Sequence, residues 1–162
     1  MDKMLEWLLN FFEVLFRTKD KSGTERPSPQ DWIPESHIIH DSSMNRVVIC
    51  LNSLGLQDKP KVWLPYIPDT NSMDGVFDFG HNNILIAGDN LQDYETLISR
   101  LKIGDIAVYN VNPSLSIIHR IVKIGQDEEG IYFTFKGDNN NESDPYKVRP
   151  ENITWISIGV IY

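Results

Sequence analysis

Three kinds of reactive side chain occur in separate segments of the chain: a serine, a histidine and a group of carboxylates. Ser72 lies in a loop-like stretch, His119 lies in a strongly β-patterned run, and the carboxylates lie in the polar run 137–144. A serine hydroxyl becomes a nucleophile when an adjacent base takes its proton, and a carboxylate can orient that base. The three segments together therefore contain the parts of a hydrolytic site.

Taken singly, these residues also have purely structural interpretations. A strand places His119 on one face with Ile117 and Ile121, where aliphatic neighbours favour the neutral imidazole that a general base requires. A histidine at a sheet edge can equally have its nitrogens satisfied by neighbours. A serine on a loop, such as Ser72, is usually a turn residue. To act as a nucleophile it needs a base and an oxyanion hole.

The run 137–144 can be a polar turn, a calcium loop or the donor of a carboxylate. The calcium interpretation fails on spacing: counted from Asp138, the sixth position is Ser143 where a calcium loop has glycine, and the twelfth is Arg149 where it has glutamate. The remaining histidines and the single cysteine lack a recognised zinc-binding spacing: His37, His40, His81 and Cys50. The sequence therefore predicts neither a metal site nor a cofactor.

The segments around these residues are mostly β-patterned. Stretches rich in β-branched or aromatic residues and bounded by turn residues predict strands over 46–51, 61–66, 83–87, 105–111, 115–124, 130–136 and 153–161. Residues 126–130 predict a hairpin turn between two of them. Across 91–101, apolar residues instead recur at helical spacing, with Asp89 or Asn90 available as a cap. We therefore expect a mainly β fold with one short inserted helix.

The N-terminal residues form a separate unit in this prediction. Residues 1–17 are apolar except for one narrow polar stripe, which predicts an amphipathic helix. The stretch is shorter than the ~20 residues that span a bilayer, and it lacks the basic start and small-residue cleavage site of a signal peptide. Such a helix can lie on a membrane surface or dock on protein. Residues 18–30 have linker composition, and 31–162 form the expected β domain.

Composition narrows the partners and the compartment. Fifteen basic and 23 acidic residues give a net charge of −8 without any cluster of lysine and arginine, so nucleic acid is a poor partner. A cationic or neutral polypeptide is a better partner for a protein with this negative net charge. The single cysteine excludes an intrachain disulfide and suits a reducing compartment. We expect a cytoplasmic protein, or one bound peripherally to a membrane.

Five segments occur in the order found in one protease family. They are Ser72-Met73, Gly104-Asp105-Ile106-Ala107-Val108, Ile118-His119-Arg120-Ile121-Val122, Lys136-Gly137-Asp138-Asn139-Asn140 and Ser157-Ile158-Gly159-Val160. With them, residues 65–162 resemble the type I signal peptidase family, in its archaeal and endoplasmic-reticulum branch. That branch carries S-M-x-P, G-D/E-I-V-V, V-H-R-V and K-G-D-N-N followed by a closing aspartate. The bacterial branch and the related LexA/UmuD-like serine peptidases use a lysine where this chain has His119.

The resemblance implies a signal-peptidase/LexA-like coiled β-sheet and a role for each matching residue. Ser72 would be the nucleophile, with its own backbone N–H as oxyanion donor, and His119 would be the general base. Asp144, six residues after Asp138, would orient the imidazole, so that the site is a Ser-His-Asp triad. The supporting residues would be Met73, Arg120 and Asp138. The substrate would be an extended polypeptide, cut after a small residue.

The chain also departs from the family pattern. Gly75 stands where S-M-x-P has proline, and the stretch 91–101 lengthens the path between Ser72 and the Gly-Asp segment. No spanning helix is evident, although signal peptidases are membrane-anchored. Ser43-Met44 is a second Ser-Met pair, but no Gly-Asp segment follows it closely. Two alternatives therefore stay open: a catalytically inactive binding or assembly module with the protease fold, and a LexA/UmuD-like self-cleaving regulator.

Overall fold

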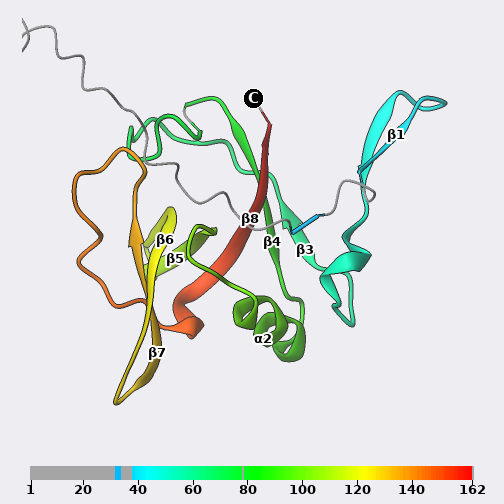
Figure 1. Ribbon diagram of the computed structural model, residues 1–162. Coiled ribbons are helices and arrows are strands. Elements are labelled where there is room, and N and C mark those ends of the chain that lie inside the picture. The colour runs from blue at the N-terminus through cyan, green and yellow to red at the C-terminus, as the bar shows by residue number, and fades with distance from the viewer. Residues whose placement is uncertain (1–31, 34–37, 78, 162) are drawn as a thin grey trace, which may run out of the picture.

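A strongly twisted antiparallel sheet, one α-helix and a separate β-hairpin make up the described part of the protein (Figure 1). The computed structural model describes residues 32–33, 38–77 and 79–161. The helix expected over 1–17 and the linker expected over 18–30 lie outside these residues. The prediction of a mainly β fold with one inserted helix is confirmed.

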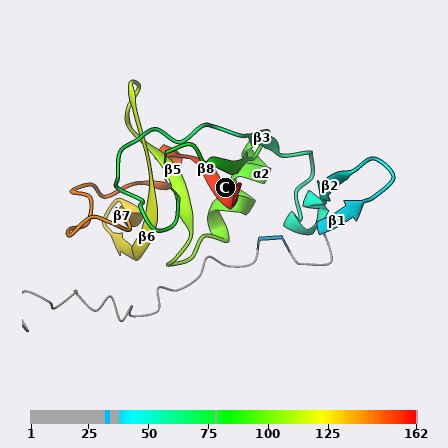
Figure 2. The ribbon, with the colours of Figure 1, turned by 90° about the horizontal axis from the view of Figure 1, so that it is seen from above.

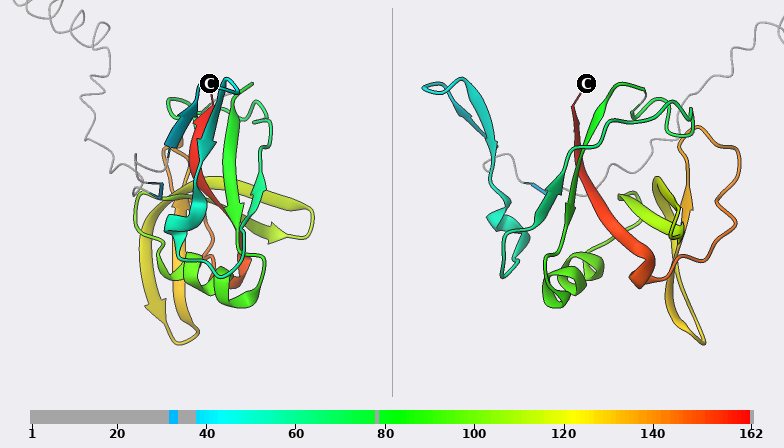
Figure 3. Two further views of the ribbon diagram at one scale, coloured as in Figure 1. Left: turned by 90° about the vertical axis from the view of Figure 1, so that its right-hand side faces the viewer. Right: turned by 180° about the vertical axis from the view of Figure 1, so that it is seen from behind.

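Six strands form the sheet, and each is antiparallel to its neighbours in the order β3-β4-β8-β5-β6-β7. The strands are β3 (Lys61–Trp63), β4 (Asn82–Ala87), β5 (Ile106–Asn112), β6 (Leu115–Asp127), β7 (Gly130–Lys136) and β8 (Ile153–Ile161). The long strand β8 lies between the pair β3-β4 and the three strands β5, β6 and β7. The right-handed twist that strands adopt turns β5, β6 and β7 away from β3 and β4 (Figures 1 and 3).

The hairpin of β1 (Ile38–Asp41) and β2 (Arg46–Ile49) stands beside the sheet without joining it (Figure 2). The Asp41 carboxylate organises its turn, because it accepts hydrogen bonds from Ser43 Oγ at 2.6 Å and from Arg46 Nε at 3.0 Å. Strand β1 lies outside the predicted strands. Its side chains are mostly exposed on both faces, so it has no buried stripe that would mark it in the sequence.

Strand ends differ from the predictions where backbone chemistry intervenes. β3 ends at Trp63 rather than 66, since Pro65 has no N–H to donate to a ladder. β5 begins at Ile106 rather than 105, because Gly104 has φ +105° and belongs to a turn. The hairpin turn predicted over 126–130 is confirmed, and it joins β6 to β7.

The helix α2 (Leu91–Ser99) confirms the helix expected within 91–101. Asn90 caps it, since its side chain accepts a hydrogen bond from the Asp93 N–H at 2.9 Å. The buried Asp93 carboxylate accepts bonds from the backbone N–H groups of Gln57 and Asp58, so it ties the preceding loop to the helix. Before the helix, a Cβ on Gly88 would lie 2.3 Å from Tyr94 N, so only glycine fits there.

The sheet buries two hydrophobic clusters on its two faces. Alternation along β5 sends Ala107 and Tyr109 into the larger cluster, which includes helix residue Leu97, and Ile106 into the smaller one. The smaller cluster consists of Ile67, Met73, Phe77 and Ile106. Its members Met73 and Phe77 anchor the loop that carries Ser72.

Substitution of Trp32 tests how strongly the first described residues contribute to the larger cluster. Its ring is 2% exposed, its Nε1 donates to Asp105 Oδ1 at 3.2 Å, and the Arg100 guanidinium lies 4.9 Å from its centroid. We expect Trp32→Ala to lower the free energy of unfolding by about 3–5 kcal/mol in urea titrations followed by circular dichroism. The matched control is Trp63→Ala. Trp63 is 49% exposed, so the loss should stay below about 2 kcal/mol. Equal losses would contradict this assignment.

Candidate active site

Ser72 and His119 line one cavity of about 310 Å³, although 46 positions separate them in the chain. One wall is the loop around Ser72, which Met73 and Phe77 fix to the smaller core cluster. The other wall is the first part of β6, from Leu115 to His119. The fold therefore brings the predicted nucleophile and the predicted base to the same space.

His119 is paired with Asp144. Its Nδ1 lies 2.7 Å from Asp144 Oδ2, and each side chain is 9% exposed. The Asp144 backbone N–H donates to the carbonyl of Phe135 at 2.8 Å, which fixes the end of the loop against β7. Because an ionised carboxylate only accepts hydrogen bonds, Nδ1 is the donor in this contact, and in a neutral imidazole the lone pair is then on Nε2. Nε2 is the atom that can act as a base.

The charge on Asp144 is stabilised by two donors. Burial alone would raise the pKa of this carboxyl, but the hydrogen bonds from His119 and from Tyr109 outweigh burial and hold it below its usual value. Tyr109 Oη donates to Asp144 Oδ2 at 2.8 Å. Asp144 is therefore an ionised acceptor that suits the orientation of an imidazole.

The loop conformation at Ser72 is held by the turn that follows β7. Asn71 has φ +56°, a left-handed conformation that asparagine tolerates better than most residues. Asn139 N donates to the Ser72 carbonyl at 2.9 Å, and Asn139 Nδ2 donates to the Asn71 carbonyl at 2.9 Å. A Cβ on Gly137 would lie 2.6 Å from Ser72 O. Glycine at this position thus lets the two loops approach each other.

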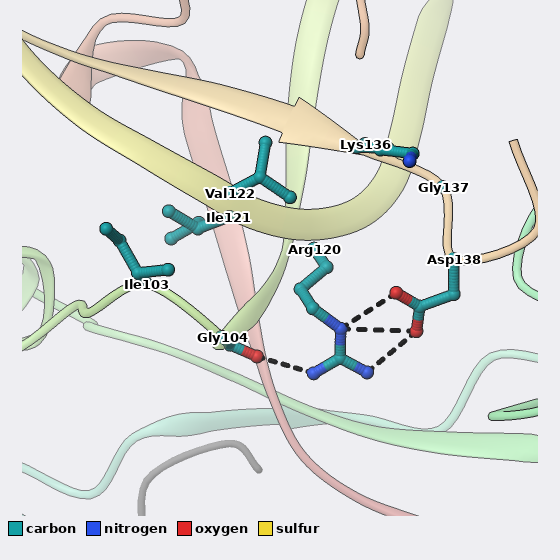
Figure 4. A pocket seen from close by; sticks show the side chains of 8 residues that line it. All are labelled: Ile103, Gly104, Arg120, Ile121, Val122, Lys136, Gly137 and Asp138. Carbon is teal, nitrogen blue, oxygen red and sulfur yellow. Dashed lines mark hydrogen bonds and ion pairs between the residues drawn. The ribbon is translucent and has the colours of Figure 1, made fainter. Parts of the chain in front are cut away.

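Arg120 and Asp138 form a buried ion pair next to this turn (Figure 4). Arg120 Nε and Nη2 both bind the Asp138 carboxylate, with a shortest distance of 2.7 Å, and Nη1 donates to the Gly104 carbonyl at 2.6 Å. The Asp138 N–H in turn lies 3.4 Å from Met73 Sδ. The three residues predicted to support the site, Met73, Arg120 and Asp138, are therefore connected in one buried network.

The hydroxyl of Ser72 does not reach His119 in this conformation. Ser72 Oγ lies 3.3 Å from Thr70 Oγ1, and no hydrogen bond joins it to the imidazole. Among the described residues, the Ser72 backbone N–H has no hydrogen-bond acceptor, so it is available to an oxyanion. Gly75 has φ +91°, which proline cannot adopt, so the loop runs differently from one built on S-M-x-P.

Ser43, the serine of the other Ser-Met pair, lies elsewhere. It sits in the turn between β1 and β2, where its hydroxyl is bonded to Asp41, and it does not line the cavity of His119. The structure therefore places Ser72, and not Ser43, across the cavity from His119.

Two contacts at the site have no counterpart in the sequence predictions: those of Tyr109 and of Thr70. Tyr109 follows the Gly-Asp segment on a buried strand, and a buried tyrosine hydroxyl needs a partner. That requirement was the available signal, but the sequence does not show which acceptor lies nearby. Thr70 carries no comparable signal, because a threonine in a polar loop is ordinary.

Within residues 32–33, 38–77 and 79–161, no three His, Cys, Asp or Glu side chains lie together so as to hold a metal ion. The helices among these residues are all too short or too polar to cross a bilayer.

The buried ion pair gives a stability prediction. Removing one partner leaves an unpaired buried charge, so we expect Arg120→Leu to cost about 3–5 kcal/mol of unfolding free energy. Arg120→Leu combined with Asp138→Leu should recover part of this loss, because no lone charge remains. The control is Arg46→Leu at the exposed pair with Asp41, where the loss should be below about 1 kcal/mol. If Arg120→Leu proved as mild as the control, the network would not hold the turn.

The lowered pKa of Asp144 gives a pH prediction. A carboxyl with a lower pKa in the folded than in the unfolded chain stabilises the fold above its unfolded pKa, near 3.8, and that contribution is lost as the pH falls through the folded value. Asp144→Asn should therefore be less stable than wild type at pH 6, and the gap should narrow below pH 3.8. Urea titrations from pH 6 to about pH 2 measure it. A gap independent of pH would contradict the prediction.

Comparison of the chain with models of protein families and with curated protein sequences finds no match. Two features of the site itself therefore indicate its chemistry: a histidine fixed by a buried carboxylate, and a serine on the opposite wall of the same cavity.

Proposed function

We propose that this protein is a serine endopeptidase of the signal-peptidase type, with Ser72 as nucleophile, His119 as general base and Asp144 as the residue that orients the base. The observation that carries the proposal is the 2.7 Å contact between His119 Nδ1 and Asp144 Oδ2, with Ser72 across the same cavity. The antiparallel sheet with one inserted helix supports the signal-peptidase/LexA-like fold that the sequence resemblance implies, without being specific to it.

The reaction needs one movement in the site. Ser72 Oγ leaves Thr70 Oγ1 and turns towards the imidazole when substrate binds; catalytic hydrogen bonds are often formed only in the substrate complex. His119 Nε2 then takes the hydroxyl proton while Oγ attacks the peptide carbonyl, and the Ser72 N–H stabilises the oxyanion. The imidazolium gives the proton to the leaving amine. Water, activated by the same imidazole, then releases the acyl group from Ser72.

An extended peptide fits the edge of the sheet beside this site. β6 pairs with β7 only from Arg120 onwards, so in the described structure no strand covers Leu115–His119 on the side away from β5. Free backbone groups on such an edge can pair with an added strand. The substrate we propose is therefore an unfolded polypeptide segment, with a small residue before the scissile bond as the resemblance implies.

One observation favours a second function. In the present conformation Ser72 is bonded to Thr70 and not to His119, as it would be if the cavity only bound peptides. The alternative is thus a peptide-binding or assembly module that keeps the protease fold without its activity.

The test is cleavage of a library of unstructured peptides, read by mass spectrometry. We expect Ser72→Ala and His119→Ala each to lower kcat at least about 10³-fold, since members of such a unit fail together. Two serine controls should keep wild-type rates. Ser43→Ala changes the second Ser-Met pair, and Ser99→Ala changes a serine of α2 whose hydroxyl donates to the Thr96 carbonyl, away from the cavity.

The same experiment separates the alternatives. Unchanged rates in both Ser72→Ala and His119→Ala would show that the assignment is wrong. Peptide binding without cleavage by wild type would favour the binding module. A cut in the chain itself, upstream of Ser72 and lost in Ser72→Ala, would instead favour the self-cleaving regulator.

A further inference from the structure

We propose that Tyr109 is a positioning residue of the site: its buried hydroxyl fixes the Asp144 carboxylate on the oxygen that binds His119, and so sets the tautomer and orientation of the imidazole. The inference rests on the proposed Ser72–His119–Asp144 site. It adds a fourth side chain that neither the motifs nor the resemblance indicates.

The contact geometry carries the inference. Tyr109 Oη lies 2.8 Å and His119 Nδ1 lies 2.7 Å from the same oxygen, Asp144 Oδ2. Tyr109 is 1% exposed, and the side chains of His119 and Asp144 are each 9% exposed. Two donors on one oxygen restrict the rotation of a buried carboxylate. The carboxylate therefore cannot readily turn its other oxygen towards the imidazole.

The pairing of β5 with β6 explains why these side chains meet. Ala107 lies directly opposite His119, and Tyr109 lies opposite Ile117. Tyr109 and His119 are therefore diagonal neighbours on one face of the sheet, a spacing that long side chains bridge. Ala107, the cross-strand partner of His119 on that face, has a small side chain, which leaves room for the imidazole.

The larger core requires the ring of Tyr109 but not its hydroxyl. The ring packs against Phe135, with centroids 4.6 Å apart, and against Tyr146 at 6.4 Å. A phenylalanine would fill the same space. The hydroxyl is a polar group placed in a hydrophobic core, and such a group needs a partner. Burial and the hydrogen bond to Asp144 raise the pKa of Tyr109, so it stays a donor across the working range of pH.

Tyr109→Phe removes only this donor. We expect kcat to fall about tenfold with KM within about twofold, since a hydrogen bond to a charged group is lost from the residue that orients the base. The pKa of Asp144, which the hydrogen bond from Tyr109 lowers, should rise, so the acidic limb of the pH–rate profile should move to higher pH. In proton NMR, the low-field Nδ1–H resonance of His119 should shift upfield or broaden. Tyr146→Phe is the matched control, because Tyr146 touches the Tyr109 ring but has no hydrogen bond to Asp144; it should leave kcat, the pH profile and the resonance unchanged.

The NMR readout is independent of peptide cleavage, so the two proposals can fail separately. Wild type could cleave no peptide while the Nδ1–H resonance moves in Tyr109→Phe and not in Tyr146→Phe. The positioning contact then stands, and the peptidase proposal fails. If Ser72→Ala abolishes cleavage while Tyr109→Phe keeps the wild-type resonance, kcat and pH profile, the inference about Tyr109 is overturned. A lower melting temperature with the resonance, kcat and pH profile all unchanged would also overturn it, because the hydroxyl would then act only on stability.

Discussion

A charge buried inside a protein must be paired. Two adjacent residues of β6 meet this requirement with partners from one loop, and these pairs determine the geometry of the site. His119 and Arg120 follow one another on a strand, so their side chains leave it on opposite faces. His119 meets Asp144 and Arg120 meets Asp138, both from the single run after β7. An isolated buried guanidinium would be far too costly to keep, so the run has to return to β6 with Asp138 in place. The position of Asp144 follows from the same return.

The Arg120–Asp138 pair also determines where the serine lies. Asp138 N reaches Met73 Sδ, and the neighbouring Asn139 holds the carbonyls of Asn71 and Ser72. The loop of Ser72 is thus fixed from one side by the charged turn and from the other by the smaller hydrophobic cluster. Gly75, with its positive φ, therefore does not leave this loop without support.

Much of the fold could be predicted from the sequence, because most elements carry a local signal. Period-two alternation marks the sheet strands, and the helix has both a stripe and a cap at Asn90. Strand β1 has no such signal, since it buries no face. At the site, the motifs predicted Ser72, His119 and Asp144, but not the contact of Tyr109 with Asp144. That contact depends on the register of β5 against β6, which only the folded chain fixes.

Asp105 connects Trp32 with the buried ion pair of Arg120 and Asp138. Its carboxylate holds the indole of Trp32 and the N–H of Lys102, its carbonyl accepts the N–H of Ile121, and it follows Gly104, whose carbonyl binds Arg120. Local opening at any of these contacts must loosen the others. The amides of this region should therefore exchange their hydrogens with solvent as one cooperative unit, at a rate set by nearly global unfolding and not by fraying. The turn that contains Asp138 should thus open as rarely as the hydrophobic core.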